Sequence, residues 1–112
     1  MTPAEFDEAC RALAGVTMVV QWGADAVYKV GGRIFAVTGS SGGVSFKSTD
    51  IAFEALTESG RARPAPYLAR AKWVHFNALG ELDADEVRDW LATAHALVAA
   101  KLTRAQRAGI GF

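Results

Sequence analysis

The fold of this chain is decided by residues 27–37, which read VYKVGGRIFAV. β-Branched and aromatic residues recur on both sides of Gly31-Gly32, a composition typical of two β-strands. Both central positions of a type I′ turn need a positive φ, which glycine adopts without steric cost. The stretch therefore predicts a β-hairpin that turns at Gly31-Gly32.

Further strands and helices extend this hairpin in both directions. The helix signals are capping patterns at Thr2–Glu5 and Asp83–Glu86, and a Gly60 stop. Residues 61–66, RARPAP, cannot be regular helix because each proline pushes its predecessor toward extended geometry. We predict an α+β two-layer sandwich of order α-β-β-β-β-α-β-α, with an antiparallel sheet of about five strands and the N- and C-terminal helices on one face. The expected helices cover about 2–15, 51–60 and 83–101, and the expected strands cover 16–22, 26–30, 33–38, 44–48 and 72–77.

The chain is predicted to form one domain over residues 1–112. With 51% apolar residues it can bury a core without disulfides. Residues 103–112 contain two glycines and no sustained period, so we expect this tail to fray. The single cysteine, Cys10, cannot form an internal disulfide, and the first residues are acidic where a secretory signal would be basic and then apolar. We therefore expect a cytoplasmic monomer without a membrane segment.

The glycine turn also predicts which side chains face outward. If the turn sets the register, Tyr28 opposes Phe35 and Val27 opposes Ala36. The face that carries Tyr28, Val30, Phe35 and Val37 is then large enough to pack against the helices. The opposite face is predicted to carry Val27, Lys29, Ile34, Ala36, Ser45, Lys47, Trp73 and His75.

The charge distribution gives this outer face a functional interpretation. The formal net charge is zero, whereas nucleic-acid-binding proteins usually have an excess of basic residues. Residues 26–75, however, carry seven bases against three acids. A basic face with interleaved aromatic residues suits phosphate contacts and base stacking. The plainer explanation is that one face of a two-layer domain is always wet, and that lysines keep it soluble.

The reactive residues form no recognisable catalytic or metal-binding pattern. Neither His75 nor His95 has a serine or cysteine nucleophile at a known motif spacing. The N-terminal acids Glu5, Asp7 and Glu8 are explained as helix-start residues. We therefore expect no enzyme activity, no metal site and no cofactor.

Four stretches together resemble the MmcQ/YjbR family. They are QWG at 21–23, VYKVGGRIFAV at 27–37, VSFK at 44–47 and PAPYLARAKWV at 64–74. With the final helix, the resemblance covers nearly the whole chain. It implies a fold like that of CyaY, the bacterial frataxin, in which helices pack on one face of an antiparallel sheet. This agrees with the architecture derived above from the residues.

The resemblance also implies a function. Members of the family are commonly described as DNA-binding proteins with a double-wing arrangement, and many have no assigned function. Arg33 stands where other members also tend to be basic. The positions that match the basic and aromatic residues of the family are Trp22, Lys29, Lys47, Arg70, Lys72 and Trp73.

Two hypotheses follow. In the first, the chain is a weak nucleic-acid-binding module, in which Lys29, Lys47, Arg70 and Lys72 contact phosphates and Trp73 stacks on or wedges between bases. In the second, it is a protein- or small-molecule-interaction domain that uses the outer sheet face or the irregular segment at 64–67 and binds no nucleic acid.

Overall fold

The computed structural model describes residues 1–21, 23, 25–39, 41–65 and 71–111. In chain order the elements are α1 (Pro3–Arg11), β1 (Val16–Gln21), β2 (Asp25–Val30), β3 (Arg33–Thr38), β4 (Val44–Lys47), α2 (Asp50–Glu58), β5 (Arg63–Pro64), β6 (Trp73–Phe76), the 3-10 turn η2 (Leu79–Glu81), α3 (Ala84–Ala99) and α4 (Arg104–Gly109).

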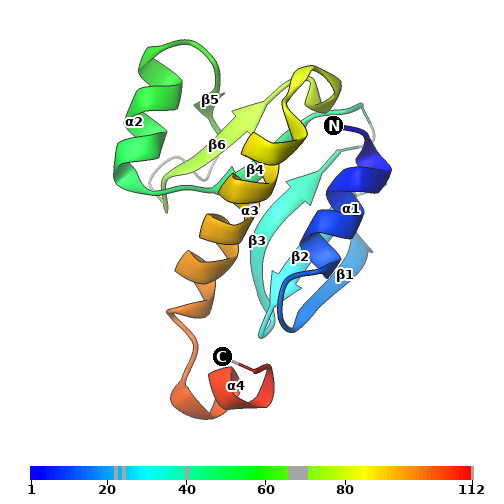
Figure 1. Ribbon diagram of the computed structural model, residues 1–112, viewed down its shortest axis with the longest axis vertical. Coiled ribbons are helices and arrows are strands. Elements are labelled where there is room, and N and C mark those ends of the chain that lie inside the picture. The colour runs from blue at the N-terminus through cyan, green and yellow to red at the C-terminus, as the bar shows by residue number, and fades with distance from the viewer. Residues whose placement is uncertain (22, 24, 40, 66–70, 112) are drawn as a thin grey trace.

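The strands form one antiparallel sheet in the order β1-β2-β3-β4-β6-β5. Helices α1 and α3 lie side by side on one face of it (Figure 1). The predicted α+β architecture is therefore confirmed. The sheet has six strands because Arg63–Pro64, within the segment 61–66 that we expected to be irregular, pairs with β6 as an edge strand. Proline is tolerated at such an edge because it needs no ladder partner for an N–H group.

Local signals in the sequence place the two helices that cover the sheet, α1 and α3. The Thr2 hydroxyl accepts a hydrogen bond from the Glu5 N–H, and the Glu5 carboxylate accepts one from the Thr2 N–H. At α3, the Asp83 carboxylate accepts from the Glu86 N–H at 3.0 Å. These caps satisfy backbone donors that the first turn of a helix leaves without partners.

The core lies between the helices and the inner sheet face. Phe6 and Cys10 of α1 are completely buried, and burial raises the pKa of the Cys10 thiol far above its usual range. His95 of α3 is also buried, and its Nε2 donates to the Ala14 carbonyl at 2.7 Å. The largest fully buried side chains on the inner face of the sheet are Phe35, Phe46, Val30, Val44 and Val74. No helix among the described residues is long and apolar enough to cross a membrane.

The β2–β3 hairpin keeps the predicted register only near its turn. Phe35 is an additional residue in β3 that forms a β-bulge, so the predicted pairs Tyr28–Phe35 and Val27–Ala36 are wrong. Alternation alone cannot reveal a residue inserted into one strand. The observed pairs are Val30–Arg33, Lys29–Ile34, Tyr28–Ala36, Val27–Val37 and Ala26–Thr38.

The bulge reverses the faces of the residues that follow it. Ala36 is fully buried in the core cluster, whereas Val37 pairs with Val27 and Ser45 and lines hollows on the outer face. The prediction that Val37 faces the helices and Ala36 faces outward is therefore wrong. Trp73 lines the outer face, as predicted, and pairs with Lys47, but the residue is only 5% exposed.

The C-terminal segment differs from the frayed tail that the sequence predicts. Thr103 and Gln106 form a capping box at the start of α4. The segment also contacts the body of the domain: Leu102 is buried beside Gly31, and Ile110 lies against Gly15.

This contact makes the two turn glycines unequal. Both have positive φ, +56° at Gly31 and +79° at Gly32, so we expect either alanine substitution to cost about 1–2 kcal/mol of backbone strain. A Cβ at position 31 would also lie 2.7 Å from two Leu102 carbons, whereas position 32 has nothing within 4 Å. In urea unfolding we expect Gly31→Ala to lower the free energy of unfolding by at least about 1 kcal/mol more than Gly32→Ala does. In a Leu102→Ala background this difference should vanish, and equal losses in the parent chain would contradict it.

Candidate functional site

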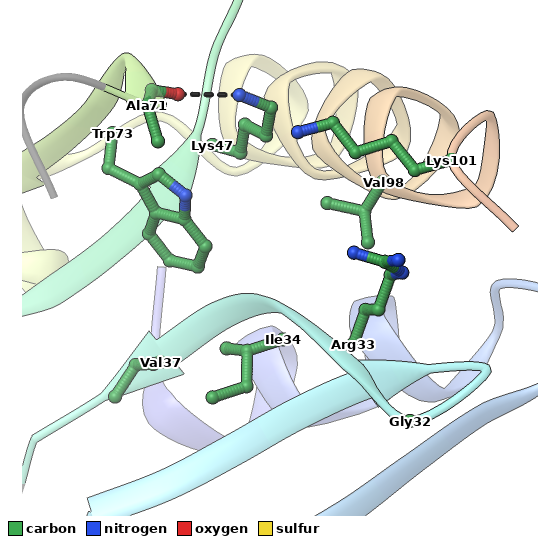
Figure 2. Close-up of a pocket in the computed structure, with 9 residues that line it drawn as sticks. All are labelled: Gly32, Arg33, Ile34, Val37, Lys47, Ala71, Trp73, Val98 and Lys101. Atoms are coloured by element: carbon green, nitrogen blue, oxygen red, sulfur yellow. Dashed lines mark hydrogen bonds between the residues drawn. The ribbon is translucent and has the colours of Figure 1, made fainter.

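The sheet opens where β3 and β4 diverge. Residues 36–38 of β3 pair with residues 44–46 of β4, so Arg33 and Ile34 lie beyond the last paired residue of β3. The opening forms a groove of about 570 Å³, which we call the basic groove (Figure 2). Its lining comes from β3, β4, the start of β6 and the end of α3: Gly32, Arg33, Ile34, Val37, Lys47, Ala71, Trp73, Val98 and Lys101.

Three cations converge on this groove from separate elements. Arg33 is the first residue of β3, Lys47 is the last of β4, and Lys101 follows the C-terminal end of α3. Among the described residues, no carboxylate lines the groove. The ion pairs of the described residues lie elsewhere, at Arg11–Asp7, Arg61–Glu86 and Arg88–Asp85. The basic groove therefore concentrates positive charge in a molecule whose net charge is zero.

Lys47 is the most constrained of the three. Its Nζ donates to the Ala71 carbonyl at 2.5 Å. Burial lowers the pKa of Lys47, and the nearby charge of Lys101 lowers it further, while Asp50 acts in the opposite direction. Lys47 and Lys101 carry like charges on the same groove, so the charge of Lys101 disfavours the charged form of Lys47.

An unusual backbone conformation supports the Ala71 carbonyl. Among the described residues, Lys72 is the one non-glycine residue with a positive φ, at 62°. Its carbonyl accepts hydrogen bonds from the Ser48 N–H at 2.9 Å and from the Ser48 hydroxyl at 2.7 Å. The end of β4 thus holds the strained turn before β6, and that turn presents Ala71 to Lys47.

The remaining wall of the basic groove is apolar. Trp73 extends its indole ring toward β3, where Ile34 and Val37 lie (Figure 2). Val98 of α3 lies between the lysines and β3. Because Trp73 is nearly buried, its ring forms a fixed side of the groove instead of the exposed stacking platform expected from the sequence.

The structure brings together three of the seven candidate residues: Arg33, Lys47 and Trp73. Lys29 shares the outer face with its partner Ile34 but does not line the groove. Lys72 instead places its Nζ 5.0 Å from the centre of the Phe53 ring on α2. Trp22 and Arg70 lie outside the described residues.

Sequence reasoning missed Lys101. Lys101 is the last residue of the helix predicted over 83–101, but no local pattern indicates that the end of this helix reaches the opening between β3 and β4. The one available signal is that Lys101 is basic and lies one helical turn after the apolar residue Leu97.

Comparison with known proteins agrees with the fold. The family model described as YjbR matches residues 11–97. The crystal structure of Deinococcus radiodurans protein DR2400, described by the family domain DUF419, superposes with a TM-score of 0.85 at 23% sequence identity. The match covers 99% of this chain and 88% of that one. No curated protein matches the chain.

The repulsion between the two lysines can be measured directly. We expect Lys101→Gln to raise the pKa of Lys47, because one of the causes that lower it is removed. The pKa should stay below its usual value, since burial of Lys47 persists. NMR titration of the lysine side-chain signals at alkaline pH measures this shift. Lys29→Gln, which removes an equal charge outside the groove, should leave the Lys47 titration unchanged, and a Lys101→Gln titration that does not move would contradict the contact.

Proposed function

The chain belongs to the YjbR family, and from its basic groove we propose that it is a weak nucleic-acid-binding module that holds the backbone of a single strand. The observation that carries the proposal is the convergence of Arg33, Lys47 and Lys101 on one groove that no described carboxylate lines. Phosphate contacts by such side chains supply most of the affinity of proteins that bind nucleic acid without sequence preference.

The three cations suit a phosphodiester in different ways. The Arg33 guanidinium has a planar fork of donors that can engage two phosphate oxygens at once. Lys47 and Lys101 act as point charges whose mutual repulsion an anion relieves. A phosphate between these lysines would therefore be bound at a place where the free protein holds unfavourable charge.

The shape of the groove favours a single strand over a duplex. The groove is a cleft between sheet and helix, with Ile34, Trp73 and Val98 as apolar walls. The sugars and unstacked bases of a single strand can contact such walls, whereas the bases of a duplex are covered on both faces by neighbouring base pairs. The proposed role is binding alone, without a catalytic step.

A second candidate, binding of a small anionic molecule, is favoured by the size of the groove. Its volume of about 570 Å³ lies within the range of small-molecule pockets, about 300–1,000 Å³. The two candidates differ in their dependence on ligand length. A sugar phosphate that binds as tightly as an oligonucleotide would favour the small molecule.

Salt dependence tests the nucleic-acid proposal. For labelled single-stranded oligothymidine, fluorescence anisotropy at low salt should give a dissociation constant on the order of 10–100 μM. With three phosphate contacts at about 0.7 each, the logarithm of the binding constant should fall with the logarithm of salt concentration with a slope of about −2. Lys47→Gln and Lys101→Gln should each reduce the magnitude of that slope by about 0.7.

A matched control is available on the helical layer. Arg88→Gln removes the same charge from an exposed residue of α3 that does not line the groove, so affinity and slope should stay near those of the parent chain. Anisotropy that does not rise at high protein concentration and low salt would refute the proposal. Equal weakening by Arg88→Gln would also count against it, because it would indicate a response to net charge alone.

A further inference from the structure

A second hollow, of about 510 Å³, lies on the outer face beside the basic groove. The ladder pairs Val37–Ser45, Ser45–His75 and His75–Arg63 place four residues in one row across β3, β4, β6 and β5. Directly opposed residues of antiparallel strands share a face. We call this site the polar hollow; it is lined by Asp25, Val37, Gly39, Ser41, Gly43, Ser45, Arg63, His75 and Asn77.

The polar hollow differs from the groove in its charge. It has one acid, Asp25, and one permanent cation, Arg63, from strands on opposite sides of it. Burial lowers the pKa of His75, and the charge of Arg63 lowers it further, while a hydrogen bond with Asn77 acts in the opposite direction. These causes favour the neutral form of His75, so Asp25 and Arg63 are the charged pair of a hollow that is otherwise rich in neutral hydrogen-bonding groups.

The hydrogen-bonding groups are held in place. The Ser45 hydroxyl and Nδ1 of His75 share a hydrogen bond of 2.8 Å. The ring of His75 packs closely over Gly43, where a Cβ would lie 3.0 Å from Cε1 and 3.3 Å from Nε2. Gly43 thus leaves the room that the imidazole occupies. A fixed array of donors and acceptors of this kind suits a neutral ligand with a polar edge.

The two sites are close enough to serve one ligand. Val37 lines both. Along β4, Ser45 of the hollow and Lys47 of the groove are two residues apart on the same face, a separation of about 7 Å. In a nucleotide one sugar separates the phosphate from the base, so a nucleotide can place its phosphate in the groove and its base in the hollow.

We propose that the polar hollow binds a guanine base of the nucleotide whose phosphate occupies the basic groove, an inference that rests on the proposed function. Guanine presents two adjacent acceptors, N7 and O6, which match the forked donors of one arginine. It also has an amino group that can donate a hydrogen bond to a carboxylate. Arg63 and Asp25 supply these two partners from opposite sides of the hollow. Ser45 and Asn77 add groups that both donate and accept.

NMR titration separates the base from the phosphate. Inorganic phosphate and ribose 5-phosphate should shift the backbone amide signals of groove residues such as Lys47 and leave Ser45, His75 and Asn77 unchanged. Guanosine 5′-monophosphate should shift both sets. The adenosine, cytidine and uridine monophosphates should shift the hollow signals less at equal concentration.

Two arginines on the same segment give a matched pair of variants. Arg63→Gln should weaken binding of guanosine monophosphate at least about fivefold, the lower limit for a lost bidentate contact to a base, with ribose 5-phosphate unaffected. Arg61→Gln should change neither affinity, because Arg61 pairs with Glu86 outside the hollow. Both residues are exposed, so neither substitution removes core packing.

The failures of the two proposals can be told apart. If all four nucleotides shift groove signals and none shifts the hollow, or if all four shift the hollow equally, the guanine site is overturned and the nucleic-acid proposal stands. If neither oligothymidine nor any phosphate compound moves the groove signals, the proposed function itself fails.

Discussion

β3 contains one residue more than β2 can pair, and the outer face of the domain depends on that bulge. Phe35 and Ala36 are both buried, so alternation is reversed beyond them and Val37 turns outward. β-Bulges also bend the strand that carries them. Arg33 and Ile34 lie before the bulge and beyond the reach of β4, and the end of α3 lies at the opening that results. The basic groove and its shared boundary with the polar hollow at Val37 both follow from this one inserted residue.

Electrostatics distinguishes the outer face from the helical layer. On the helices, Arg11, Arg88 and Glu86 form ion pairs, the last with Arg61. These pairs are largely exposed and contribute little to stability. In the basic groove, Lys47 is held on the Ala71 carbonyl, and burial together with the nearby charge of Lys101 lowers its pKa. A net charge of zero therefore conceals a local excess of positive charge. An arrangement that is unfavourable in the free protein is favourable when an anion is bound.

Much of the architecture follows from local patterns. The capping residues Thr2 and Asp83 mark the starts of α1 and α3, and Gly31-Gly32 marks the hairpin. The edge strand β5 was missed because it has two residues and one of them is a proline, a composition that in isolation indicates irregular chain. Its pairing depends on β6, a partner whose position the local sequence does not specify. The candidate site was anticipated in part: Arg33, Lys47 and Trp73 meet, while Lys29 and Lys72 are directed elsewhere.

The order of helices and strands, the tight turn and the family are properties of short segments, because capping, turn geometry and alternation act between residues that are near in the chain. The meeting of Lys101 with Arg33 and Lys47, and of Ser45 with His75, is not of this kind. It depends on the bulge at Phe35, on the order in which strands pair and on where α3 ends over the sheet. These are outcomes of packing across the whole domain, and packing brings together residues whose spacing along the chain carries no trace of their contact.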